Sequence, residues 1–145
     1  MANPFVNDID NAQYDYVQEI DSMPIFKEYA WDFTKDTFKT NSLNQHIITE
    51  KNEALKIWIY KTLKTERYRY LIYSNGYGTE LEQFYGKPNT AATALYMQRY
   101  IKEGLLVNPY IKKIDNISIE QQDDIVTLNI TLTSIYGDLT TEVNI

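Results

Sequence analysis

Carboxylates are the side chains of this sequence with the clearest capacity for chemistry. Glu66, Glu80 and Glu82 lie close together in the sequence and beside aromatic residues. Glycoside hydrolysis uses two carboxyl groups of unequal environment, and aromatic rings can stack on sugars. Glu80 and Glu82 flank Leu81 in a segment that we expect to be exposed, where neither carboxyl pKa would be raised far. A peptidoglycan hydrolase is therefore kept as an alternative, and no catalytic residue is predicted.

Other arrangements for catalysis or ligand binding are missing from the sequence. The sole histidine, His46, has no serine or acid at a recognisable catalytic spacing, and we expect a structural role for it. The absence of cysteine excludes disulfides, thiolate zinc sites and cysteine nucleophiles. Asp123-Asp124 is too short for a calcium loop, and Gly76 and Gly78 lack the third glycine of a dinucleotide fingerprint. We expect no metal, no cofactor and no enzymatic activity.

Acidic residues are concentrated in the first quarter of the chain. The 145 residues include 14 Lys+Arg and 20 Asp+Glu, which gives a net charge of −6. Residues 1–36 hold eight acids and two bases, so they carry this whole charge, whereas residues 37–145 balance at twelve and twelve. Phosphate binding needs a positive surface, so nucleic acid is not an expected partner.

Targeting and membrane segments are not expected either. The first 20 residues lack the basic start and the apolar core of a signal peptide. No window approaches the roughly 20 apolar residues of a membrane span. The sequence therefore predicts a soluble protein with no membrane partner.

The hydrophobic pattern predicts one α+β domain at residues 28–145, preceded by an acidic N-terminal arm at residues 1–27. The length suits a single domain. Residues 28–39 alternate between aromatic and polar side chains around a Lys35-Asp36 turn. This alternation predicts an N-terminal β-hairpin.

Two main helices are expected after the hairpin. Thr49 is the predicted N-cap of a helix over residues 50–64, with Glu in its first turn and Lys in its last. Residues 68–73 predict a short strand, and a second helix is expected between Pro88 and Pro109. Spacings of three and four place the apolar residues of each helix on one face, which must pack on a sheet or on another helix. The predicted buried residues are Ala54, Leu55, Trp58, Ile59 and Leu63 in the first helix and Ala94, Met97, Ile101 and Leu105 in the second.

The C-terminal third of the chain predicts an antiparallel β-meander. Residues 111–120 and 125–134 face each other across a polar turn, and the second run alternates between apolar and polar side chains. A last strand over residues 139–145 follows the turn at Gly137. Its open edge would expose unpaired N–H and C=O groups, with which another chain can pair. The alternative is that this strand only completes the sheet of its own domain. The residues of the second run expected to face inward are Val126, Leu128, Ile130 and Leu132.

The order of these elements resembles that of the small baseplate-wedge and sheath-initiator family of contractile phage tails, which includes a tail protein of the defective phage PBSX and is catalogued as lysozyme-like. The resemblance covers about residues 28–136. It includes the opening hairpin and a long second helix that ends in a proline motif before a β-hairpin. Its most specific stretch is residues 53–81, EALKIWIYKTLKTERYRYLIYSNGYGTEL. There the matching residues are Ala54, Leu55, Trp58, Ile59 and Leu63, the aromatic strand after Thr65, Tyr77-Gly78 and Glu80-Leu81.

The resemblance implies a structural role in a contractile phage tail or a bacteriocin-type tail-like particle. Family members lie around the tail tube, join the baseplate and start polymerisation of the sheath. The implied partners are the sheath protein, the tail tube protein and other wedge proteins, with six copies around the tail axis. Assembly would take place in the host cytoplasm, before incorporation into the baseplate of the particle. The lysozyme-like label carries no activity across, because fold-level labels do not transfer function.

Two groups of partner-binding residues follow from the resemblance and from the open edge. In the family the second helix commonly ends in Glu-Pro-Arg before Ile, whereas this sequence has Asn108, Pro109 and Tyr110 before Ile111. The ion pairs that such a Glu and Arg make with a neighbouring wedge subunit would then be replaced by neutral, hydrogen-bonded contacts, or lie elsewhere. A generic adaptor protein is the remaining alternative. The residues expected to accept a sheath strand are Leu139, Thr141, Val143 and Ile145.

Overall fold

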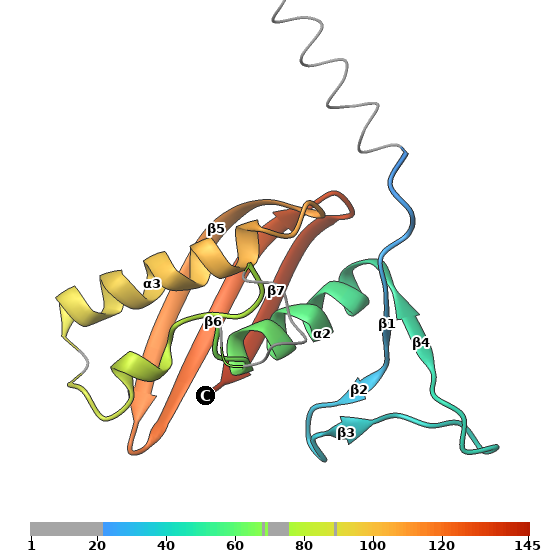
Figure 1. Cartoon of the computed structure of the whole chain (residues 1–145), viewed down its shortest axis with the longest axis horizontal. Coiled ribbons are helices and arrows are strands. Elements are labelled where there is room, and N and C mark those ends of the chain that lie inside the picture. The colour runs from blue at the N-terminus through green and yellow to red at the C-terminus, as the bar shows by residue number, and fades with distance from the viewer. Residues whose placement is uncertain (1–21, 68, 70–75, 89) are drawn as a thin grey trace, which may run out of the picture.

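The computed structural model describes residues 22–67, 69, 76–88 and 90–145, and it is an α+β fold (Figure 1). Two helices, α2 (Lys51–Lys64) and α3 (Ala91–Leu106), lie in front of a three-stranded antiparallel sheet. The strands of this sheet are β5 (Ile111–Gln122), β6 (Ile125–Ser134) and β7 (Gly137–Asn144), in the order β5-β6-β7. The main hydrophobic core lies between these helices and the sheet. The predicted fold class is therefore confirmed. Apart from Arg69, the predicted strand over residues 68–73 lies outside the described residues, as does most of the predicted arm.

Four short strands precede the first helix. β2 (Trp31–Asp32) pairs with β3 (Thr37–Phe38), and β1 (Lys27–Tyr29) pairs with β4 (Ile48–Glu50). The hairpin predicted for residues 28–39 is present as β2 and β3, with the turn expected between them. It is shorter than predicted, because β1 pairs with a strand that follows the hairpin in sequence.

The helix α2 (Lys51–Lys64) begins one residue later than predicted, and its predicted N-cap is wrong. Thr49 lies in β4 opposite Glu28, and the N-cap position is occupied by Glu50, whose side chain makes no capping hydrogen bond. The pairing with β1 keeps residues 48–50 extended, so the chain enters the helix through Lys51, which has a φ of 58°. The N–H of Lys51 donates to the carbonyl of Phe26 at 2.9 Å.

Buried side chains lie on two sides of α2. Leu55, Ile59 and Leu63 belong to the main core, as predicted, whereas Trp58 is only half-buried. On another side, the buried Tyr60 packs against the ring of Phe33, with 5.0 Å between the ring centroids. Phe33 lies in the turn between β2 and β3, so this hairpin packs against α2.

The connection between the two helices packs against both of them. Glu66 and Thr79 form a parallel bridge, and the N–H of Thr79 donates to the carbonyl of Thr65 at 3.0 Å. Thr79 is buried against Gly104 of α3, where an added Cβ would lie 2.5 Å from the Thr79 Cγ2 atom. Gly104 therefore allows this connection to approach the helix closely.

The second helix, α3 (Ala91–Leu106), lies where the proline boundaries predicted it. Its N-cap is Thr90, whose hydroxyl accepts from the N–H of Thr93 at 3.2 Å. The predicted inner residues Met97, Ile101 and Leu105 are buried, and Ala94 is half-buried.

The sheet consists of β5 (Ile111–Gln122), β6 (Ile125–Ser134) and β7 (Gly137–Asn144). The predicted inward residues of β6 are confirmed, since Leu128, Ile130 and Leu132 are fully buried and Val126 is half-buried. The meander and its open edge strand are thus the part of the fold closest to the prediction.

Candidate assembly interface

The strand β7 forms one edge of the sheet. The pair Val126 and Ile145 shows which residues of β7 bond to β6 and which direct their backbone groups outward. Val126 and Ile145 exchange both of their backbone hydrogen bonds, at 3.1 and 2.9 Å. In an antiparallel pair, bonded and non-bonded residue pairs alternate. The bonded pairs of β6 and β7 are therefore every second pair counted from Ile145. The residues that direct their N–H and C=O groups away from β6 are Asp138, Thr140, Glu142 and Asn144.

The four residues predicted to accept a strand direct their backbone groups toward β6 and not toward the open edge. Leu139 and Val143 are 4% and 1% exposed, and Thr141 and Ile145 are half-buried. Their side chains face the helices, and their backbone groups bond to β6. They therefore anchor the edge strand, while the outward backbone groups belong to the intervening residues. The sequence feature that could have indicated these outward residues is the two-residue turn between Ser134 of β6 and Gly137 of β7, from which the bonded pairs can be counted.

One outward carbonyl of β7 has a partner within the chain. Asn52, in the first turn of α2, donates from Nδ2 to the carbonyl of Asp138 at 3.4 Å. The Oδ1 atom of Asn52 accepts from the Ser134 hydroxyl at 2.5 Å. Among the described strands, only β6 pairs with β7. Asn52 thus fixes the start of the edge. The outward backbone groups of Thr140, Glu142 and Asn144 face no other described strand.

The predicted corner at the end of α3 holds the N-terminal segment of the described chain. The hydroxyl of Tyr110 donates to the carbonyl of Pro24 at 2.6 Å, and the Tyr110 ring lies 4.9 Å from the ring of Phe26. The Tyr136 hydroxyl accepts from the N–H of Phe26 at 3.0 Å. Burial raises the pKa of the Tyr110 hydroxyl, and the neighbouring Tyr136 adds to this shift. Residues 24–26 of the predicted arm are therefore packed against the domain.

The outer surface of this corner is apolar. Asn108 is buried, and its Oδ1 accepts from the N–H of Tyr110 at 2.9 Å. Pro109 is exposed, beside Leu106 and Val107, which are 47% and 52% exposed. The predicted Asn108 and Tyr110 thus support the corner from inside, and Pro109 lies on its surface. The sequence signal for the missed residues is the apolar run Leu105 to Val107, since three consecutive helical residues span about 200° of the helix and cannot all face the core.

The carboxylates of the hydrolase alternative come together only in part. Glu66 Oε2 accepts from the N–H of Glu82 at 3.4 Å, while the Glu82 carboxylate pairs with Arg69. Burial raises the pKa of Glu66, and the Glu82 and Glu80 carboxylates add to this effect. A carboxyl group of raised pKa beside an ionised one is an arrangement used in general acid catalysis. Neither Glu66 nor Glu82 lines the cavity that is enclosed by Met97, Val126 and Ile145 among others.

The sole histidine packs in the N-terminal strands. The His46 ring lies 5.4 Å from Tyr29 and 5.0 Å from Phe38, and His46 forms a β-bridge with Thr40. The described residues contain no group of three or more His, Cys, Asp or Glu placed to hold a metal ion. Within those same residues, no helix is long and apolar enough to cross a membrane.

Comparisons with known proteins identify relatives in sequence and in fold. A family model described as the contractile injection system sheath initiator matches residues 27–137. The chain is 31% identical over 114 residues to the phage-like element PBSX protein XkdS of Bacillus subtilis (strain 168), a match that covers 75% of this chain and 81% of that protein. The crystal structure of a putative tail lysozyme from Geobacter sulfurreducens is similar in fold, with a TM-score of 0.56 and 13% identity over 64% of this chain and 87% of that chain. That last similarity shows the fold alone. The motif-based resemblance is confirmed: the chain belongs to the contractile injection system sheath initiator family.

Proposed function

We propose that the chain starts sheath assembly by accepting a β-strand of a sheath subunit along β7. Its role is structural, in the baseplate of a contractile tail. The observation that carries the proposal is the edge of β7, where Thr140, Glu142 and Asn144 direct their backbone groups away from β6. A strand added to such an edge gains main-chain hydrogen bonds irrespective of its sequence, and side-chain pockets supply the specificity.

The anchoring of β7 supports this role. Leu139 and Val143 are buried in the core, and eight residue pairs join β7 to β6. An edge held in this way needs little ordering when a strand is added, so less of the binding free energy is lost. The residues predicted from the sequence therefore contribute by holding the edge strand in place.

We place the contact with a neighbouring wedge protein at the corner after α3. The exposed Leu106, Val107 and Pro109 form the kind of apolar surface that marks protein interfaces. Asn108 and Tyr110 hold the corner in shape from behind. The acidic arm at residues 1–27 would contact a basic surface of the tube or of a wedge neighbour. Six copies would surround the tail axis, after assembly in the host cytoplasm of a phage or a bacteriocin-type particle.

We propose no enzymatic activity for this chain. The rival is a peptidoglycan hydrolase in which Glu66, with its raised pKa, would be the acid. A peptidoglycan turnover assay on the purified chain and on Glu66→Gln separates the two. Robust activity that the substitution removes would overturn the structural proposal. A generic adaptor would be indicated if imaged particles lacked this chain between the baseplate and the first sheath ring.

Strand addition is tested with purified sheath protein from the same particle. Thr140→Pro removes an outward N–H that β6 does not use, and proline is tolerated on edge strands. Thr140→Val keeps that N–H and is the matched control. We expect the chain and Thr140→Val to shorten the lag of sheath polymerisation, and Thr140→Pro to lose this effect while remaining folded. Equal nucleation by a folded Thr140→Pro would refute strand addition at this edge.

A further inference from the structure

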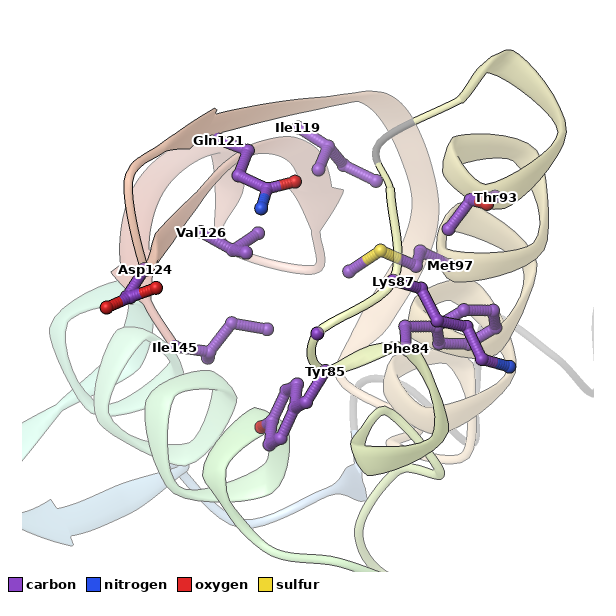
Figure 2. Close-up of a pocket in the computed structure, with 11 residues that line it drawn as sticks. Phe84, Tyr85, Lys87, Thr93, Met97, Ile119, Gln121, Asp124, Val126 and Ile145 are labelled. Atoms are coloured by element: carbon purple, nitrogen blue, oxygen red, sulfur yellow. The ribbon is translucent and has the colours of Figure 1, made fainter.

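A cavity of about 340 Å³ lies between the sheet, α3 and the segment that precedes α3 (Figure 2). Its volume is within the range of sites that hold a bound group. Figure 2 shows Met97 of α3, Val126 of β6 and Ile145 pointing into this space from different sides. Tyr85 and Phe84 close it on the side of the preceding segment.

Three of the lining residues form one row across the sheet. Gln121 of β5 lies opposite Val126 of β6, and Val126 is bonded to Ile145 on the other side. Residues directly opposite one another in neighbouring strands have their side chains on the same face. The next position in this row lies beyond Ile145, where a strand added to β7 would run.

We propose that the cavity receives one bulky apolar side chain of the added strand, from the residue opposite Ile145. This inference rests on the proposed strand addition. Ile145 directs its backbone groups toward Val126. A residue on its other side would therefore form a non-hydrogen-bonded pair with it, in which side chains approach most closely. The side chain of that residue would follow Gln121, Val126 and Ile145 in the row across the sheet and would enter the cavity.

The lining favours an uncharged occupant. Met97 is buried, and Ile119, Val126 and Ile145 are half-buried apolar residues. The ammonium group of Lys87 lies over the ring of Phe84, 5.8 Å from its centroid. The two charged lining residues, Lys87 and Asp124, are exposed to solvent. A charged side chain that entered among the apolar residues would lose its hydration there, which is unfavourable.

The cavity would also define the register of the added strand. A shift of one residue turns every side chain of a strand to the opposite face of the sheet. The bulky residue would then leave the cavity for the solvent-exposed face. Main-chain hydrogen bonds alone give no such discrimination, since they are the same in each register.

The experiment fills the cavity and measures binding of purified sheath protein. Val126→Phe adds volume inside, and Ile125→Phe, at the exposed neighbouring position, is the matched control. We expect Val126→Phe to weaken sheath binding about tenfold or more, since burial of one large apolar side chain is lost. Ile125→Phe should bind as the unmodified chain does. Gln121→Phe, at an exposed lining position, is the second filling variant if Val126→Phe fails to fold.

Comparison with Thr140→Pro separates this inference from the proposed function. Weak binding by Thr140→Pro together with full binding by a folded filling variant would overturn the cavity inference and leave strand addition standing. Full binding by both would overturn both. A loss of thermal stability in the free filling variants without any loss of sheath binding would assign the cavity to the chain's own residues, which also refutes the inference.

Discussion

The hydroxyl group of Tyr110 donates a hydrogen bond to the carbonyl of Pro24 at 2.6 Å, across 86 positions of sequence. Tyr110 follows the second helix, and Pro24 precedes the first strand of the structure. The contact therefore joins the N-terminal segment to the start of the C-terminal sheet. It also gives the tyrosine of the predicted partner-binding corner a defined role inside the domain.

Removal of this hydroxyl should weaken the attachment of the N-terminal segment. We expect Tyr110→Phe to lower the free energy of unfolding by about 0.5–1.5 kcal/mol, which is typical of one hydrogen bond. Urea denaturation measures this change. Tyr96→Phe, at an exposed position on α3, is the matched control and should leave stability unchanged. Equal stability of both variants would show that the bond to Pro24 contributes nothing.

Backbone amide exchange should alternate along β7. The N–H groups of Leu139, Thr141 and Val143 bond to β6 and should exchange slowly, while those of Thr140, Glu142 and Asn144 should exchange quickly. NMR-detected exchange on the free chain resolves these amides one by one. Addition of sheath protein should protect the fast set selectively. Uniform protection in the free chain would mean that this edge is already paired.

The close approach at Gly104 makes a specific prediction about stability. Gly104→Ala improves the helix propensity of α3 by about 1 kcal/mol. The new Cβ, however, would lie 2.5 Å from the Thr79 Cγ2 atom. We expect a net loss of about 1–3 kcal/mol from overpacking, measured by chemical denaturation. Thr79→Ser removes that methyl group, so the double variant should recover part of the loss. Additive effects of the two substitutions would contradict this explanation.

The raised pKa of Glu66 predicts how stability changes with pH. The folded chain binds a proton on Glu66 more tightly than the unfolded chain, in which the pKa is near 4.5. Stability from this group is therefore fully present below about pH 4.5 and is lost as the pH rises through the folded pKa. Glu66→Gln should gain stability relative to the unmodified chain between pH 4 and pH 7, as urea denaturation at both values would show. Glu120→Gln controls for the loss of one exposed charge. A pH-independent difference for Glu66→Gln would refute the prediction.

The apolar corner should matter for incorporation and little for folding. Val107→Asp places a charge where we expect a wedge protein to pack, and burial of an unpaired charge is costly. We expect fewer variant copies per purified particle, counted by quantitative mass spectrometry, at unchanged thermal stability. Leu95→Asp, at an exposed apolar position far along α3, is the positional control. Normal incorporation of Val107→Asp would remove this corner from the interface.

Local periodicity accounts for the parts of the fold that the sequence predicted. The inward residues Leu128, Ile130 and Leu132 follow from alternation alone, because the side-chain period of a strand is a local property. The N-cap at Thr49 was wrong for a non-local reason, since Glu28 pairs with Thr49 and keeps it extended. No local pattern contains that pairing.

The candidate site, like the fold, was predictable only where local sequence patterns determine it. The alternation of apolar and polar residues predicted an edge strand at the end of the meander. To identify which of its backbone groups face outward, however, the register of its pairing with β6 had to be known. The role of Tyr110 required knowledge of Pro24, which no spacing rule connects to it. Family motifs located the corner and the meander, and the tertiary contacts determined which atoms are exposed there.

The link from Asn52 to Ser134 and Asp138 has a mechanical consequence. A pull along β7 would act at right angles to its hydrogen bonds with β6, so all of them would resist together in shear. A pull away from the sheet would instead open the bonds one at a time, starting at an end. Asn52 ties one of those ends, where β6 turns into β7, to the first turn of α2. Peeling from that end would therefore be resisted by α2, and tension along an attached strand would be transmitted to the helix as well as to the sheet.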